Sequence, residues 1–121
     1  MAHLSNTLTI MLLEDEPRVA CALAYMITSL GWAIVLVDSV EQARAIFHEH
    51  EDLFAIVADY RMNSEKTGLD FLKWAKRERE DVRRILISGQ DLRRSYVEIQ
   101  DHCHTFLPKP FEVSDLEAAL Q

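Results

Sequence analysis

The sequence predicts an α/β fold: a (βα)5 sandwich of three layers, with a five-stranded parallel sheet between two layers of helices. Two observations lead to this prediction. Five short apolar segments recur along the 121 residues, and stretches with helical periodicity separate them. In four of the five segments nearly every residue is apolar, which is typical of strands buried on both faces. Strict alternation of strand and helix then implies parallel pairing, right-handed crossovers and helices on both faces.

The apolar segments define the predicted strands. They are Thr9–Leu13, Ala33–Val37, Phe54–Ala58, Arg84–Ile87 and Thr105–Leu107. The clearest helix lies between the first two strands, because Pro17 suits a first-turn position and Gly31 suits the residue after a helix end. The inward face predicted for this helix consists of Val19, Leu23, Met26, Ile27 and Leu30.

Capping signals predict the starts of the second and fifth helices. Ser39 and Gln42 have the spacing of a capping box, and so have Ser114 and Glu117 near the end of the chain. The inward residues predicted for the second helix are Val40, Ala43, Ile46 and Phe47.

Helical periodicity predicts the third and fourth helices. The third runs from about Gly68 to Glu80, and the fourth begins after Asp91. The inward residues are Leu69, Leu72, Trp74 and Ala75 in the third, and Leu92, Tyr96, Ile99 and Cys103 in the fourth. The longest stretch without a predicted element is the loop 60–67.

Charge and composition exclude several classes of protein. The chain has 13 Lys and Arg against 20 Asp and Glu, a net charge of −7, and its basic residues form no cluster longer than a pair. This distribution lacks the positive surface that binds nucleic-acid phosphates directly. The polar Met1–Thr7 and the short apolar run 8–13 predict neither a signal peptide nor a membrane span. With Cys21 and Cys103 interpreted as buried, reduced thiols, we expect one cytoplasmic domain over residues 1–121.

Ionisable or hydroxyl side chains that suit a site follow four of the five predicted strands. In an open parallel sheet, ligands bind beyond the carboxyl ends of the strands, where the strand order reverses. For the order 2-1-3-4-5 the reversal lies between the first and third strands, which brings Glu14, Asp15 and Asp59 together. Ser88 and Lys109 then flank these carboxylates from one side. Asp38, which follows the second strand at the edge of the sheet, is left out of the predicted site.

The predicted group of carboxylates requires a cation. Three negative charges and Lys109 sum to −2, the charge that one divalent ion neutralises, and oxygen-only ligands favour Mg²⁺, with Mn²⁺ as a substitute. A carboxylate, a metal, a lysine and a hydroxyl together suit phosphoryl transfer. We predict Asp59 as the nucleophile because it follows the central strand alone, whereas Glu14 and Asp15 are adjacent and suited to hold the metal jointly.

Four short motifs occur in order at the ends of these strands. They are LLEDEP (12–17), ADYRM (58–62), ISG (87–89) and FLPKPF (106–111). Together the motifs resemble those of the receiver domain of two-component response regulators, and the resemblance covers essentially the whole chain. It implies a flavodoxin-like fold and a signalling module of a phosphorelay, rather than an enzyme that turns over a metabolite.

The resemblance also implies the roles of the acidic residues. Asp59 accepts a phosphoryl group from a phosphohistidine of a histidine kinase or a histidine phosphotransfer protein. Glu14 and Asp15 hold Mg²⁺ together with Asp59 and the backbone carbonyl of Arg61.

A second set of implications concerns the switch. Ser88 and Lys109 contact the phosphoryl group, Ser88 moves toward it, and Phe106 is the switch aromatic that turns inward. These movements remodel the surface of the fourth helix, the fifth strand and the fifth helix. A downstream protein or a fused output domain reads that surface, and the chain itself contacts neither nucleic acid nor membrane.

The chain departs from the family pattern at two places. Asn63 stands where many receivers have proline, and Ser64–Thr67 lengthens the loop that follows. The stretch Asp101–His104 replaces the small Gly-Ala pair that is common before the last strand.

Three other functions would use some of the same residues. A phosphohydrolase of the haloacid dehalogenase type needs a cap domain and a second aspartate two residues after the nucleophile, where this chain has Arg61. A flavin carrier of the flavodoxin type needs a phosphate-binding loop after the first strand, where the 14–16 carboxylates would repel a phosphate. A degenerate receiver that acts only as an interaction scaffold would lack part of the carboxylate set, which is complete here.

Overall fold

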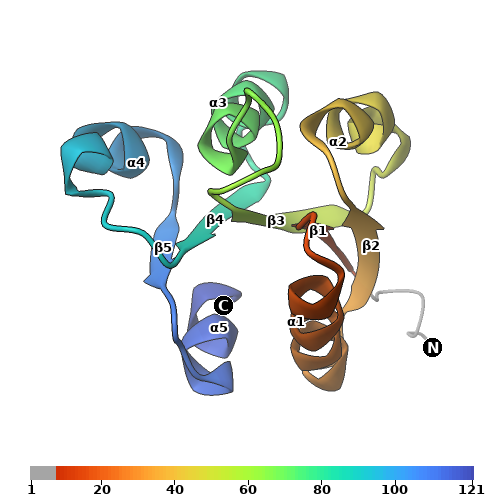
Figure 1. Ribbon diagram of the computed structural model, residues 1–121. Helices are drawn as coiled ribbons and strands as arrows, with labels where there is room; N and C mark the ends of the chain where they lie inside the picture. The colour runs from red at the N-terminus through yellow and green to blue at the C-terminus, as the bar shows by residue number, and fades with distance from the viewer. Residues whose placement is uncertain (1–7) are drawn as a thin grey trace.

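The computed structural model describes residues 8–121, which form a single sheet of five parallel strands with helices on both faces (Figure 1). The strand order is β2-β1-β3-β4-β5, so the predicted fold class is confirmed. The prediction that Met1–Thr7 is not part of a signal peptide concerns residues outside this range. Between residues 8 and 121 no helix combines the length and the apolar character needed to cross a membrane.

A helix follows each strand. The strands are β1 (Thr9–Leu13), β2 (Ala33–Val37), β3 (Leu53–Asp59), β4 (Arg83–Ser88) and β5 (Thr105–Pro108). The helices are α1 (Pro17–Ser29), α2 (Val40–Ile46), α3 (Gly68–Glu78), α4 (Tyr96–His102) and α5 (Val113–Ala119), and two 3₁₀ turns are η2 (Phe47–Glu49) and η3 (Arg93–Ser95). All five predicted strand segments lie within the observed strands.

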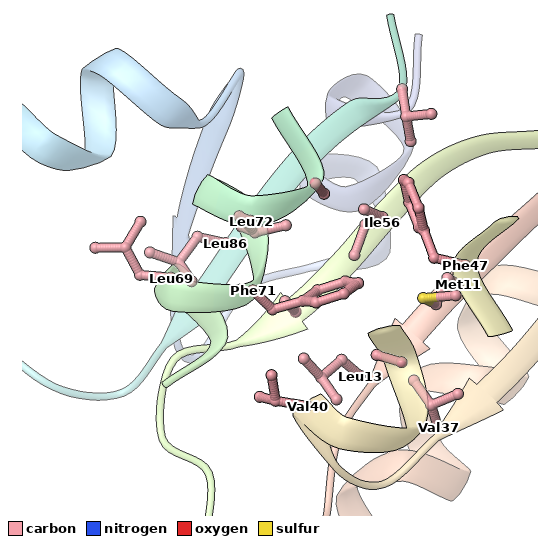
Figure 2. Close-up of a cluster of buried hydrophobic side chains, with 14 of the residues drawn as sticks. Met11, Leu13, Val37, Val40, Phe47, Ile56, Leu69, Phe71, Leu72 and Leu86 are labelled. Carbon is pink, nitrogen blue, oxygen red and sulfur yellow. The ribbon is translucent and has the colours of Figure 1, made fainter. Parts of the chain in front are cut away.

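The sheet separates two hydrophobic cores. The helices α2, α3 and α4 cover one face of the sheet, and α1 and α5 cover the other (Figure 1). Figure 2 shows the first core, where Met11 and Leu13 of β1 pack with Phe71 of α3. The alternate residues of the same strand, Ile10 and Leu12, belong to the second core. All five side chains are fully buried, which is why the apolar residues of this strand are continuous in sequence.

The ends of α1 and the start of α2 follow their sequence signals closely. Gly31 comes just after α1 with a φ of 99°, the left-handed conformation that favours glycine. Ser39 caps α2, because its hydroxyl accepts the backbone N–H of Gln42 at 3.0 Å. The predicted capping box is wrong in its second half, since the Gln42 side chain accepts the N–H of Asp38 instead of that of Ser39.

The predicted start of α5 is also wrong. The capping residue is Glu112 rather than Ser114, and Asp115 completes a reciprocal capping box by accepting the Glu112 N–H at 2.8 Å. The Asp115 carboxylate therefore satisfies the N–H of the capping residue, and the helix begins earlier than the Ser114 signal predicts. A third capping box, between Thr67 and Asp70 at the start of α3, was not predicted.

Two expectations about buried side chains need correction, and one buried side chain was not expected. Tyr96 is 59% exposed, because the 3₁₀ turn η3 precedes α4 and breaks the 3.6-residue spacing counted from Leu92. Cys21 is exposed, since it follows the buried Ala20 on α1 and therefore points away from the core. Phe71 is fully buried although it was not predicted, because α3 lies between α2 and α4 and buries a broad face (Figure 1).

Candidate functional site

Four predicted site residues lie at the carboxyl edge of the sheet. Glu14 follows β1, Asp59 ends β3, Ser88 ends β4 and Lys109 follows β5. A cavity of about 590 Å³ opens at this edge, and three of the four residues line it. The cavity is also lined by Asp15, Glu16, Val19, Arg61, Met62, Asn63, Gly89 and Gln90. The fourth residue, Ser88, is 1% exposed and is not part of the lining.

Both carboxylate oxygens of Asp59 have partners. The Lys109 ammonium lies 2.9 Å from Oδ2, and the backbone N–H of Arg61 donates to Oδ1 at 3.2 Å. The Asp59 side chain is 8% exposed and that of Lys109 is 30% exposed, so the ion pair lies at the inner end of the cavity. This arrangement orients the carboxylate and keeps a positive charge beside it, where a group gaining negative charge would be stabilised.

Glu14 has an incomplete set of partners. Its Oε2 accepts the backbone N–H of Glu16 at 3.0 Å, whereas its Oε1 is buried and has no hydrogen-bond partner within residues 8–121. Burial, together with the neighbouring carboxyl of Asp59, raises the pKa of Glu14 to about 7. A buried carboxylate oxygen is normally hydrogen-bonded, and one without a donor is free to bind a hard cation. Glu14 therefore fits the predicted magnesium site.

Asp15 is turned toward a loop. Its Oδ2 accepts the backbone N–H of Asn63 at 2.5 Å, which joins the segment after β1 to the loop after β3. In the part of the chain that the structure describes, no three His, Cys, Asp or Glu side chains are grouped closely enough to hold a metal ion together. The Asp15 carboxylate would have to move closer to join Glu14 and Asp59 around a cation. Asp38, which was left out of the predicted site, lines a separate cavity of about 250 Å³ beside Asp15.

Neither Ser88 nor Phe106 is part of the cavity lining. The Ser88 hydroxyl accepts the backbone N–H of Gln90 at 2.9 Å, and its carbonyl accepts the N–H of Lys109 at 2.8 Å. Phe106 of β5 is partly buried and packs against the first core. The roles predicted for these two residues in switching stay predictions.

Gly68 is a residue of the site that the sequence interpretation treated only as a helix start. A Cβ at this position would overlap the backbone carbonyl oxygen of Asp59 and would lie 2.8 Å from its carbonyl carbon. The Gly68 N–H also donates to the Tyr60 carbonyl at 2.9 Å, so the loop 60–67 begins and ends beside Asp59. The sequence indicates this close approach only by placing a glycine, a poor helix former, directly after the capping residue Thr67.

Comparison with known proteins identifies the family. The family model of the response regulator receiver domain matches residues 10–121, and the chain therefore belongs to this family of two-component signalling domains. Among curated protein sequences, none matches the chain.

Solved structures agree with the family at the level of the fold. A response regulator receiver protein from Pseudomonas putida is 24% identical, with a TM-score of 0.85 and coverage of 94% of this chain and 95% of that chain. A receiver domain protein from Clostridium thermocellum is 21% identical, with a TM-score of 0.86 and coverage of 93% and 90%. The response regulator TrrA from Thermotoga maritima, solved in complex with Mg²⁺ and BeF, is 20% identical, with a TM-score of 0.82 and coverage of 93% and 95%.

Proposed function

We propose that this chain is a phosphoacceptor that takes a phosphoryl group from the phosphohistidine of a histidine kinase or a histidine phosphotransfer protein onto Asp59. One observation carries the proposal: in a member of the receiver family, the Asp59 carboxylate is paired with Lys109 at 2.9 Å at the inner end of an open cavity. The proposal treats residues 1–121 as one cytoplasmic receiver domain, and the two free cysteines suit a reducing compartment.

The transfer requires a divalent cation, for which Mg²⁺ is the best candidate and Mn²⁺ a substitute. Glu14, Asp15 and Asp59 would hold the ion together with the backbone carbonyl of Arg61. When bound, the ion neutralises charge on the oxygens of the phosphoryl group. The unpartnered Oε1 of Glu14 supports this set of ligands, as does the capture of Mg²⁺ and BeF by the related TrrA.

Asp59, Lys109 and Ser88 have different roles in the transfer. A carboxylate oxygen of Asp59 attacks the phosphorus atom as the phosphorus–nitrogen bond to histidine breaks, which leaves an acyl phosphate and a free imidazole. The Lys109 ammonium stabilises the added negative charge, and the Ser88 hydroxyl turns from Gln90 to donate a hydrogen bond to a phosphoryl oxygen. This step consists mainly of alignment and charge neutralisation. The phosphoryl group stays on Asp59 as a signal, and the chain processes no metabolite.

The output of the switch lies on the surface formed by α4, β5 and α5. Ser88 and Phe106 connect the site to this surface, since both belong to the β4–β5 edge of the sheet. A downstream protein or a fused output domain would bind there. The net charge of −7 argues against direct binding of nucleic acid by this chain.

The direct test is labelling by a small phosphoryl donor. Incubation with acetyl phosphate and Mg²⁺, followed by intact-mass spectrometry, should show one added phosphoryl group. The label should be absent in the presence of a chelator and in Asp59→Asn. Lys109→Ala should lose most of the labelling, because the positive charge beside the accepting carboxylate is gone. A parent protein that stays unlabelled by acetyl phosphate and by phosphohistidine donors would contradict the proposal and favour a scaffold function.

A further inference from the structure

A buried arginine joins three segments at the amino end of β4. Arg84 is 4% exposed and forms no ion pair with any residue from 8 to 121. Its Nε donates to the His102 carbonyl at 2.6 Å, and its Nη1 donates to the carbonyls of Glu80 and Val82 at 2.9 and 3.0 Å. A buried guanidinium held only by carbonyl oxygens is costly, and burial lowers the pKa of Arg84.

His104 completes the junction. The ring Nδ1 of His104 accepts the backbone N–H of Arg84 at 2.9 Å, and the backbone N–H of His104 donates to the Arg84 carbonyl at 2.8 Å. The arginine side chain thus satisfies the backbone of the α4 exit, and the histidine side chain satisfies the backbone of β4. We call the group formed by Arg84, the His102 carbonyl and His104 the exit clasp. It occupies the stretch 101–104 in which this chain departs from the usual receiver pattern.

Two further contacts join α4 to α3. The Lys76 ammonium of α3 donates to the Asp101 carbonyl at 2.6 Å near the carboxyl-terminal end of α4, and Lys73 of α3 forms an ion pair with Glu98 in its first turn. With the exit clasp, α3 and β4 therefore hold the carboxyl-terminal end of α4 at two points of its backbone, the carbonyls of Asp101 and His102.

The amino-terminal end of α4 is held differently. In the described part of the chain, the side chains and turn contacts of Asp91, Arg93 and Ser95 form hydrogen bonds only with residues of the same segment. Tyr96 and Val97 are 59% and 68% exposed. The one polar contact from this segment toward the site is the N–H of Gln90 on the Ser88 hydroxyl.

We infer that the exit clasp makes the carboxyl-terminal end of α4 a fixed pivot, so that phosphorylation moves α4 mainly over residues 90–97. The inference rests on the proposed function, because a phosphoryl group on Asp59 would draw the Ser88 hydroxyl away from the Gln90 N–H. The freed segment 90–95 then shifts, while His102 and His104 stay bound to Arg84. The surface that changes is therefore the end of α4 that carries Tyr96 and Val97.

Amide hydrogen exchange of the full chain, followed by NMR, tests the pivot. With Mg²⁺ and beryllofluoride as the phosphoryl mimic, exchange over residues 90–97 of the parent should change about tenfold, and exchange over 102–105 by less than about twofold. In His104→Ala the Arg84 N–H loses its acceptor, so the changed region should extend through 102–105. His104→Asn keeps an acceptor oxygen near the place of Nδ1 and should restore the parent pattern. His48→Ala is the matched control: it removes a different exposed histidine, which contacts Glu78 and lies outside the exit clasp, and it should leave the pattern unchanged.

The outcomes separate the pivot from the function on which it rests. A response of the parent that extends evenly through residue 105, or a parent-like pattern in His104→Ala, overturns the pivot alone. A parent that shows no response to Mg²⁺ and beryllofluoride at any residue overturns the proposed function and the pivot together. Exchange of the Arg84 amide in the absence of beryllofluoride gives a further check, since His104→Ala should accelerate it about tenfold and His104→Asn should not.

Discussion

The ammonium of Lys109 lies 2.9 Å from Oδ2 of Asp59, although β4 separates the strands that carry the two residues. The lysine reaches across the end of β4 at Gly89, where a Cβ would lie 3.9 Å from both Cβ and Cδ of Lys109. A Cβ at position 89 would therefore make only ordinary contacts with the lysine stem. The site depends in this way on all three strands, and the buried carboxyl of Glu14 contributes to the pH dependence of stability.

The raised pKa of Glu14 predicts how stability changes with pH. Between the ordinary value of 4.5 and about 7, the folded protein binds more protons at Glu14 than the unfolded chain does. The contribution of Glu14 to the free energy of unfolding therefore falls as the pH rises through this interval, by on the order of 3 kcal/mol. Glu14→Gln should remove this contribution and stabilise the metal-free protein at about pH 8.

Urea denaturation in the presence of a chelator measures the effect. The lowered pKa values of His102 and His104 act in the opposite direction, so the informative quantity is the difference in stability between Glu14→Gln and the parent. This difference should grow in favour of the variant from about pH 5 to about pH 8. A difference that stays constant over the interval would show that Glu14 is ionised throughout.

The Asp15–Asn63 hydrogen bond predicts a spectroscopic report of metal binding. If the Asp15 carboxylate binds Mg²⁺, its charge and position change beside the Asn63 N–H, so the Asn63 amide should show one of the largest NMR shift changes during a Mg²⁺ titration. Asp15→Asn should weaken Mg²⁺ binding by about tenfold or more, because one anionic ligand is lost. Saturation of the variant at the same Mg²⁺ concentration as the parent would place the ion elsewhere.

Gly68 predicts an unusual response to alanine. Alanine within a helix is ordinarily more stable than glycine by about 1 kcal/mol. At Gly68 the added Cβ would overlap the Asp59 carbonyl, so Gly68→Ala should instead destabilise the fold by about 2 kcal/mol or more and displace Asp59. Gly89→Ala is the matched control, since its Cβ makes only ordinary contacts. Equal thermal stability of the two variants would contradict this packing.

The two cysteines should react at different rates. Cys21 is exposed on α1, whereas burial raises the pKa of Cys103 to about 11. Because the thiolate is the reactive form, a maleimide at neutral pH should label Cys21 at least about tenfold faster than Cys103. Cys21→Ser should remove the fast phase and Cys103→Ser should keep it. Equal rates at the two positions would show that Cys103 is accessible.

Much of the fold could be predicted because it depends on local patterns. Continuous apolar segments such as Thr9–Leu13 required burial on both faces, and Pro17 and Gly31 marked the ends of a helix. The position of the candidate site followed from topology, since polar residues after parallel strands meet at one edge of the sheet. Asp59 and Lys109, 50 residues apart, could be placed together on this ground alone.

Features that depend on competing partners could not be predicted in this way. Glu112, whose N–H is accepted by Asp115, took the place of Ser114 as the capping residue, and the 3₁₀ turn η3 rotated Tyr96 out of the core. Arg84 belonged to a segment read as an almost wholly apolar strand, and its carbonyl partners become apparent only when the α4 exit is folded against β4. The turn of Asp15 toward Asn63 likewise depends on the path of a loop that has no regular periodicity.

The identity of the phosphorylated residue is the most direct test of the account. After incubation with acetyl phosphate and Mg²⁺, sodium borohydride reduces an aspartyl phosphate to homoserine, which peptide mass spectrometry locates in the sequence. A phosphoacceptor role of Asp59 predicts homoserine at position 59 and at no other carboxylate, only when Mg²⁺ is present. Homoserine at position 15, the five-carbon alcohol 2-amino-5-hydroxypentanoic acid at position 14, or an unchanged Asp59 in protein that carries the phosphoryl group, would contradict this assignment.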